Sequence, residues 1–300
     1  VMLLFLVSLF AFVVWSLESY APRLLPEAAS EHGVLIDWLY DFNWIIIFIV
    51  FAITQFLLFY FAFKYYGRKD NRATYFPHNN KLEMIWTVIP AVVLAVITIL
   101  GLKQWNQITA PASEDAIVVQ LYAKQFDWTA RFAGKDNKLG DSFYKKITDT
   151  NPLGMDSADV KGHDDIVVKN EIHIPLGKEV EFKLNSRDVI HSAYMPHFRS
   201  QINCVPGMTT VMHFVPTITT AEMRKRPYVV NLMAGINKKR AEKGEKPVEF
   251  DYVLLCNKIC GNSHYNMQMT IIVDTPEDYQ KWINSKKPFF AKEEATVASN

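Results

Sequence analysis

Cysteine is scarce in this sequence: only three occur among 300 residues, which excludes a framework of several disulfide bonds. An excess of one charge is also missing. The chain has 32 Lys and Arg against 31 Asp and Glu, and this balance argues against a nucleic-acid-binding protein. Aromatic residues are not scarce, since 20 Phe, 13 Tyr and 7 Trp supply enough apolar surface for a core and exclude intrinsic disorder.

Charged residues are few in the first third of the chain. Residues 1–103 carry seven basic and seven acidic side chains, which leaves 25 and 24 for the other 197 residues. Three uncharged runs, at about 1–17, 42–63 and 84–102, approach or reach the ~20 residues that cross a hydrocarbon core. We therefore predict a transmembrane region over 1–103 with a helix in each run. The alternative for each run is a buried core helix, and the first run has a second alternative, a signal peptide.

The charges of the loops predict the orientation of these helices. Residues 64–81 carry five basic side chains and one acid, whereas residues 18–41 carry five acids and one basic side chain. By the positive-inside rule the 64–81 loop is cytoplasmic, so the third helix runs outward. Everything after about residue 104 is then expected on the outer side of the membrane.

Beyond residue 104 the pattern changes to short β-branched and aromatic runs. We expect strands in this region at 116–122, 166–174, 178–184, 188–195, 209–215, 250–256 and 269–274. Such short strands predict an all-β sandwich or barrel, here over residues 104–275. Two stretches break the pattern, at about 133–165 and 219–247, and are predicted insertions, of which the second is helical and basic. Residues 276–300 are expected to form a short helix and a polar tail.

The chemistry is concentrated between residues 256 and 267. Cys256, Cys260, His264 and Met267 form a soft ligand set, which selects copper over hard cations. No Cys-x-x-Cys-His occurs, which excludes c-type haem attachment, and the Cys-x3-Cys spacing matches neither thioredoxin nor a zinc ribbon. A blue-copper site uses one Cys, so the second thiolate favours two sulfurs bridging two copper ions, with His191 as the second imidazole. The alternatives are a Cys256–Cys260 disulfide and a structural His191.

Four motifs occur in an order that resembles the subunit II family of cytochrome c oxidases, in the haem-copper oxidase superfamily. They are the Cys-x3-Cys-Gly-x2-His-x2-Met loop, Asp188-Val-x-His-Ser followed by Pro206-Gly207, Gln125-x-x-Trp128, and Leu82-Glu-x-x-Trp-Thr-x-x-Pro90. The resemblance implies two to three transmembrane helices followed by a cupredoxin-like β-sandwich. It also implies an oxidoreductase subunit in a bacterial inner membrane, with the copper domain on the periplasmic side.

The resemblance further implies a binuclear CuA centre, made of two copper ions, that accepts electrons from cytochrome c. The electrons then pass to subunit I, which carries the haem and reduces oxygen to water with proton pumping. Carried over to this sequence, the ligands are Cys256 and Cys260 as bridges, His191 and His264 one per copper, Met267 axially and the backbone carbonyl of Lys258. Phe126 and Trp128 are then expected where electrons arrive, and Glu83 at a proton-uptake path, unless it is only an interfacial anchor.

Some positions depart from the family pattern. Lys258 replaces a glutamate that usually helps to bind magnesium, so no magnesium is expected on this side chain. Phe126 stands where the family typically has tryptophan. If the basic 219–247 segment lies near Phe126, a tethered or acidic cytochrome c domain is the expected donor; otherwise the segment is a solvated helix face. Two other functions are alternatives to an electron-entry subunit. One is a copper-free scaffold, as in quinol oxidases, and the other is a copper chaperone or a nitrous-oxide-reductase-like domain. The complete ligand set and the membrane motif argue against both.

Overall fold

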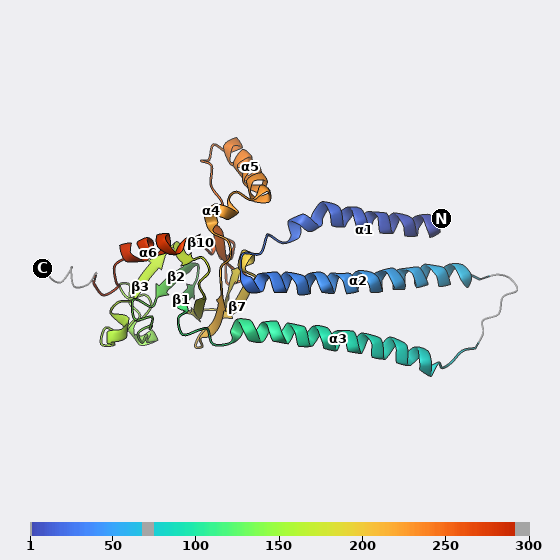
Figure 1. The fold of residues 1–300 in the computed structure, drawn as a ribbon, viewed down its shortest axis with the longest axis horizontal. Helices are drawn as coiled ribbons and strands as arrows, with labels where there is room; N and C mark the ends of the chain where they lie inside the picture. Colours follow the sequence, from blue (N-terminus) through green and yellow to red (C-terminus); the bar gives the residue numbers. More distant parts are fainter. Residues whose placement is uncertain (1, 68–74, 292–300) are drawn as a thin grey trace. The chain divides into compact units, whose positions relative to one another are not determined.

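The computed structural model describes residues 2–67 and 75–291, which fall into two compact units (Figure 1). One unit combines residues 1–27 with 35–107, and the other combines residues 28–34 with 108–300. Three of the basic residues in the predicted cytoplasmic loop, Arg68, Lys69 and Arg72, lie outside the described residues. Residues 292–300 of the predicted tail lie outside them as well. The orientation in the membrane therefore stays a prediction.

Three helices form the first unit, one over each uncharged run of the sequence. They are α1 (Met2–Leu24), α2 (Glu31–Lys64) and α3 (Asn80–Thr109). Among the described residues, α2 and α3 are long and apolar enough to cross a membrane, whereas the apolar stretch of α1, Val7–Glu18, is shorter. Two membrane spans are thus supported by length and composition, and the third, at 1–17, stays a prediction.

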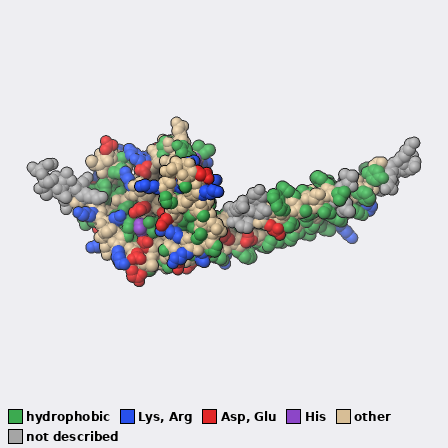
Figure 2. All heavy atoms as spheres, turned by 90° about the horizontal axis from the view of Figure 1, so that it is seen from above, with side chains coloured by type: hydrophobic (Ala, Val, Ile, Leu, Met, Phe, Trp, Pro, Cys, Tyr) green, Lys and Arg blue, Asp and Glu red, His purple; other side chains and the backbone are tan. Residues whose placement is uncertain are grey.

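The surfaces of these helices are apolar on all sides. Among their described residues, α3 has none that is buried and α2 has only Gly33. Helices that are hydrophobic all round are typical of a lipid environment. In Figure 2 the helical part is largely hydrophobic, whereas the surface of the other part mixes both signs of charge. This contrast agrees with the uneven distribution of charge along the sequence.

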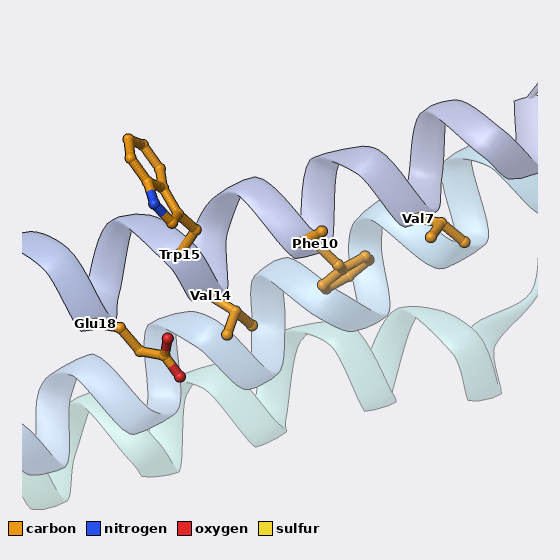
Figure 3. Close-up of a pocket in the computed structure, with 6 residues that line it drawn as sticks. Val7, Phe10, Val14, Trp15 and Glu18 are labelled. Carbon is orange, nitrogen blue, oxygen red and sulfur yellow. The ribbon is translucent and has the colours of Figure 1, made fainter.

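Helix α1 contacts α2 through aromatic rings. The ring centroids of Phe5 and Phe59 lie 5.6 Å apart, and those of Phe10 and Phe51 lie 6.1 Å apart. A shallow hollow on α1 is lined by Val7, Phe10, Ala11, Val14, Trp15 and Glu18 (Figure 3). Its lining is apolar apart from one carboxylate, so it offers no set of groups for a polar ligand.

The second unit is a sandwich of two five-stranded sheets, as the sequence predicted. One sheet has the order β3-β2-β1-β5-β8, with β1 (Ile117–Lys124), β2 (Asp127–Phe132), β3 (Ile166–Lys169), β5 (Val180–Ser186) and β8 (Thr210–Phe214). The other has the order β4-β10-β9-β6-β7, with β4 (Glu171–Pro175), β6 (His191–Met195), β7 (Ser200–Cys204), β9 (Tyr252–Cys256) and β10 (Gln268–Asp274). Most neighbours pair antiparallel, but β1 with β5 and β4 with β10 pair parallel.

The core lies between the two sheets. Every second residue of β5 is buried, which is the period expected of a strand with one face on a core. Phe182, Phe198 and Phe214 meet there, with centroid separations of 5.3 Å for Phe182–Phe214 and 4.7 Å for Phe198–Phe214. These rings join the two sheets, because Phe182 and Phe214 belong to β5 and β8 and Phe198 lies between β6 and β7.

The segment between β2 and β3 is irregular and contains only two short turns of 3-10 helix, Tyr144–Lys146 and Val160–Gly162. A buried ion pair between Arg131 and Asp165 anchors it, with both side chains at most 1% exposed. The Arg131 guanidinium also donates to the Gly140 carbonyl at 2.7 Å. Burial raises the pKa of Asp165 in spite of the adjacent Arg131. The pair holds both ends of the segment against the sandwich.

Three helices complete the second unit: α4 (Thr220–Met223), α5 (Pro227–Glu242) and α6 (Pro276–Ser285). The first two lie in the basic segment between β8 and β9, and α4 begins with a capping box formed by Thr219 and Glu222. Helix α6 lies against β4, where the ring of Trp282 stacks on His173 with centroids 4.4 Å apart.

Candidate metal centre

Three strand ends of one sheet bring the candidate ligands together. His191 is the first residue of β6, Cys256 is the last residue of β9, and Met267 directly precedes β10. Strands β6 and β9 are antiparallel with Ala193 opposite Cys256, so the start of β6 meets the end of β9. The 257–267 loop is closed by the Cys256 N–H, which donates to the Met267 carbonyl at 3.1 Å.

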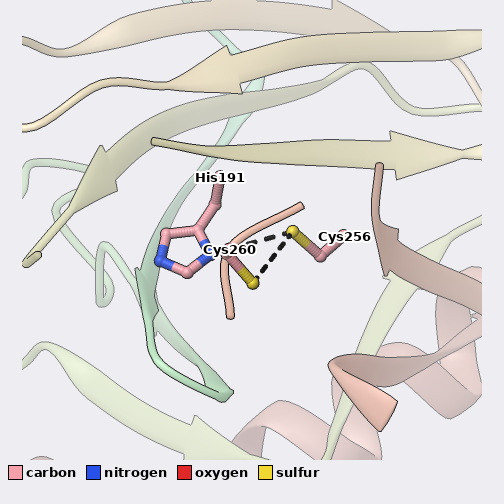
Figure 4. A group of neighbouring side chains, drawn as sticks. All are labelled: His191, Cys256 and Cys260. Carbon is pink, nitrogen blue, oxygen red and sulfur yellow. Dashed lines mark hydrogen bonds between the residues drawn. The ribbon is translucent and has the colours of Figure 1, made fainter. Parts of the chain in front are cut away.

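The donor atoms form a compact cluster. The Sγ atoms of Cys256 and Cys260 are 3.8 Å apart, and both thiols are free, so the disulfide alternative is not formed (Figure 4). His191 Nδ1 lies 3.7 Å from the Cys256 sulfur, and His264 Nδ1 lies 3.5 Å from the Cys260 sulfur. Each thiol thus has one imidazole beside it.

Two weaker donors lie next to the thiols. The Met267 Sδ is 3.8 Å from the Cys260 Sγ, and the Lys258 carbonyl accepts a hydrogen bond from the Cys256 thiol at 3.2 Å. The structure therefore groups all six ligand positions that the sequence analysis named. It also leaves the Lys258 side chain exposed, so only the backbone of this residue faces the cluster.

Most of the ligand residues are buried. Cys256 and Cys260 are 8% and 5% exposed, Met267 is 1% exposed, and His191 is fully buried. Burial and the neighbouring Cys256 thiol raise the pKa of Cys260 to about 11. Without a cation, therefore, the Cys260 sulfur keeps its proton at neutral pH, whereas a bound metal ion displaces thiol protons. Two thiols, two imidazoles and a thioether fit a soft metal such as copper.

Asp188 orients His191, a role that sequence reasoning missed. Its Oδ1 lies 2.8 Å from His191 Nε2, which leaves Nδ1 to face the Cys256 sulfur. Burial alone would raise the pKa of Asp188, but hydrogen bonds from the Gln125 backbone N–H and from His191 outweigh it and lower the pKa. A carboxylate behind a metal-binding histidine commonly fixes its tautomer and ring orientation. The signal was present, because Asp188 opens the Asp-Val-x-His-Ser motif.

Gln125 contacts both Asp188, which orients His191, and the loop that carries Cys260. Its backbone N–H donates to Asp188 Oδ2 at 2.7 Å, and its side-chain amide donates to the Cys260 carbonyl. The β1–β2 turn therefore holds both the histidine side and the cysteine loop. This explains the place of the glutamine in the Gln125-x-x-Trp128 motif.

The structure brings the two aromatic candidates beside the ligands. The Phe126 ring packs on Gly261 so closely that a Cβ on Gly261 would lie 2.8 Å from two ring carbons. Gly261 also has φ +141°, a conformation that favours glycine. The Trp128 ring is 1% exposed and meets the His191 ring edge-on, with centroids 6.3 Å apart. Phe126 thus contacts the loop that carries Cys260, and Trp128 contacts the ring of His191.

Glu83 belongs to the helical unit rather than to the metal centre. It lies in the first turn of α3, where the Asn79 side chain accepts a hydrogen bond from the Leu82 N–H at 3.0 Å. A carboxylate in this turn is favoured by the positive end of the helix dipole. Its position in the helix thus agrees with an interfacial anchor at the membrane boundary. The role of Glu83 in proton uptake stays a proposal.

The basic insertion joins the sandwich away from the ligand cluster. The Thr220 hydroxyl accepts a hydrogen bond from the Val273 N–H, near the end of β10, whereas Met267 precedes the start of that strand. The Tyr252 hydroxyl, at the start of β9, donates to the Ile218 carbonyl, whereas Cys256 ends β9. Since β-strands rise about 3.3 Å per residue, the opposite strand ends are well separated. The attachment of the insertion therefore gives no support to a donor site shared with Phe126.

Comparisons with known proteins identify the family of the chain. A family model described as cytochrome c oxidase subunit II, transmembrane domain, matches residues 19–103. The chain is 32% identical over 272 residues to the alternative cytochrome c oxidase subunit 2 of Bradyrhizobium diazoefficiens, covering 90% of this chain and 86% of the relative. The chain belongs to the cytochrome c oxidase subunit II family. It is accordingly a membrane-bound subunit of an oxidoreductase, and it belongs to a multi-subunit haem-copper oxidase complex.

Other members of the family are more distant. Cytochrome c oxidase subunit 2 of Thermostichus vulcanus is 28% identical over 283 residues, which cover 86% of this chain and 77% of the relative. A crystal structure of the periplasmic domain of subunit II from Bradyrhizobium japonicum is 18% identical and has a TM-score of 0.35, covering 58% of this chain and 94% of that one. The family assignment depends on the sequence relatives and not on this weak structural likeness.

Proposed function

We propose that the chain receives electrons for a respiratory cytochrome c oxidase at a binuclear CuA centre. The observation that carries the proposal is the pair of free thiols 3.8 Å apart, each with one imidazole nitrogen within 3.7 Å. A symmetric set of this kind suits two copper ions that share two bridging sulfurs. A blue-copper site has only one cysteine ligand, whereas this cluster has two. When bound, the copper pair supplies reversible one-electron redox chemistry.

The residues of the chain then have distinct roles. Cys256 and Cys260 would hold both copper ions, His191 and His264 would each hold one, and Met267 and the Lys258 carbonyl would be the weak ligands. Asp188 and Gln125 hold these groups in place and are positioning residues. Because the ligands are held before the metal binds, little rearrangement is needed when the charge of the centre changes.

The electron donor is proposed to be cytochrome c or a tethered cytochrome c domain, and the acceptor subunit I, which carries the haem. Phe126 and Trp128 are the proposed points of arrival, because they connect the Cys260 loop and the His191 ring. Subunit I then reduces oxygen to water with proton pumping. The membrane is proposed to be the bacterial inner membrane, with the copper domain on the periplasmic side, as the loop charges indicate.

The second candidate is a copper-free scaffold, as in quinol oxidases. It requires that the ligand set be incomplete, whereas all five ligand side chains lie in one cluster here. The observed cluster therefore favours the copper-containing function.

Metal analysis of the full-length chain tests the proposed function. Purified in detergent and loaded with copper, the chain should bind two copper ions, and the oxidised form should give an electron paramagnetic resonance spectrum of one electron shared by two copper nuclei. One copper per chain, or a spectrum of a single copper nucleus, would overturn the proposal.

Glu83→Gln tests the proposed proton-uptake role. The change removes the titratable group but keeps the size and hydrogen-bonding capacity of the side chain, so we expect slower oxidase turnover in the assembled complex. Ionisable groups at membrane depth often mark proton relays. The CuA spectrum should not change, because Glu83 and the copper ligands lie in different units. Wild-type turnover would leave only the boundary role for this residue.

A further inference from the structure

Helix α5 presents an exposed face that the metal centre does not explain. Leu232 and Ile236 are 51% and 37% exposed, and Lys239 and Lys243 are exposed as well. With 3.6 residues per turn, positions 232, 236, 239 and 243 lie along one side of the helix and its C-terminal end. Two apolar side chains are thus followed by two lysines along a single accessible stripe, which we call the α5 stripe.

This face belongs to a well-anchored helix. Val229 is 1% exposed and packs in the core of the sandwich. The Asn237 side chain makes two hydrogen bonds to the backbone of Val248, at 3.0 and 2.9 Å. Arg240 forms an ion pair with Glu245 at 2.9 Å. The first turn of the helix is thus held in the core, and its C-terminal half is held by the loop that follows it.

The charge of the segment is strongly positive. Its basic side chains are Arg224, Lys225, Arg226, Lys238, Lys239, Arg240, Lys243 and Lys246, against Glu222, Glu242 and Glu245. Arg224 and Arg240 pair with acids, whereas Lys238, Lys239 and Lys243 have no ion pair among the residues that the structure describes. The charge that remains accessible is therefore cationic and suits an anionic surface.

The segment leaves the sandwich beside the start of a membrane-spanning helix. The Thr217 N–H donates to the Ala29 carbonyl at 2.9 Å, and the Glu31 N–H donates to the Val215 carbonyl at 3.2 Å. Glu31 is the first residue of α2, and Thr220, three residues after Thr217, is the first of α4. The uncharged run of α2 begins at Phe42, and eleven residues of helix span only about 16 Å. The attachment point of the insertion is therefore close to the membrane along the chain.

We propose that the α5 stripe rests on the anionic phospholipid surface of the membrane that α2 and α3 cross. Leu232 and Ile236 lie at the boundary between headgroups and acyl chains, and Lys239 and Lys243 bind lipid phosphates. An amphipathic helix with basic residues beside apolar ones binds membranes in this way, and the attraction grows with the content of anionic lipid.

Hydrogen exchange of the full-length chain in lipid nanodiscs tests this proposal. The nanodiscs contain phosphatidylcholine alone or phosphatidylcholine mixed with phosphatidylglycerol. We expect the amides of residues 228–243 to exchange at least about threefold more slowly in the anionic nanodiscs. The double variant Lys239→Glu/Lys243→Glu should lose this difference, whereas Lys138→Glu/Lys145→Glu, with the same charge change at exposed positions of the 133–165 segment, should keep it.

The other outcomes overturn the proposal. Equal exchange in both kinds of nanodisc, or a difference that both double variants keep, excludes binding of the α5 stripe to anionic lipid. Protection that requires added oxidase subunits or an acidic cytochrome domain assigns the stripe to a protein partner instead. The copper spectrum, recorded on the same samples, tests the proposed metal centre independently of hydrogen exchange. A failure of the proposed function and a failure of the proposed lipid contact are therefore distinguished.

Discussion

Replacing Cys260 by serine is expected to leave a chain that binds one copper ion or none, with oxidase turnover at least about 100-fold lower. The Cys260 sulfur lies 3.8 Å from the Cys256 sulfur, 3.5 Å from His264 Nδ1 and 3.8 Å from Met267 Sδ, so it connects the two halves of the cluster. A serine hydroxyl is a hard donor that stays protonated at neutral pH, and it cannot bridge two soft metal ions.

Cys204→Ala is the matched control for this experiment. Cys204 lies opposite His191 in the β6–β7 pair, but it is fully buried in the core, and burial raises the pKa of its thiol to about 12. Its sulfur therefore stays protonated, and the variant should still bind two copper ions. Metal analysis and electron paramagnetic resonance decide the comparison. Two copper ions in Cys260→Ser, or their loss in Cys204→Ala, would contradict the ligand assignment.

Replacing Arg131 by methionine is expected to lower the free energy of unfolding of the β domain by about 3–5 kcal/mol. The change leaves the carboxylate of Asp165 buried without its cation, in a place where burial already raises the pKa of this group. The Gly140 carbonyl also loses its hydrogen bond from the guanidinium. Chemical denaturation of the full-length chain in detergent, followed by the fluorescence of tryptophan, measures the loss.

Two further variants separate the buried pair from a general effect of charge. Arg131→Met/Asp165→Leu removes both partners and should recover much of the stability, because no uncompensated charge remains. Lys146→Met breaks an exposed ion pair with Asp156 and should cost far less, because water screens it. A loss as large for Lys146→Met as for Arg131→Met would contradict the role assigned to burial.

Local patterns could be read from the sequence, but pairings could not. The run 166–174 was predicted as one strand, whereas the structure divides it at Asn170, which has φ +72°, into β3 and β4 of opposite sheets. Strands β2 and β7 were not predicted, although β2 carries Trp128. Strand β2 is buried at five consecutive positions, so it lacks the alternation by which a half-buried strand is recognised.

The contribution of Ala29 and Ser30, which precede α2, to the core of the β domain also depends on tertiary contacts. Ala29 and Ser30 are fully buried, and Ser30 forms an isolated bridge with Pro216. In the sequence these residues lie far from the β domain, between two apolar runs, and no local pattern marks them as part of its core. A contact between residues so distant in the chain is decided by the packing of the whole domain.

By itself the sequence determined the membrane-like first third, the β domain that follows it and the types of donor atom in the candidate metal centre. These properties depend on hydrophobicity, periodicity and side-chain chemistry, which are local. Only the tertiary structure decided that Asp188 and Gln125 hold the ligands, that the two free thiols lie 3.8 Å apart, and that the basic helix is attached beside the start of α2. These facts depend on strand register, which places residues far apart in the sequence within hydrogen-bonding distance.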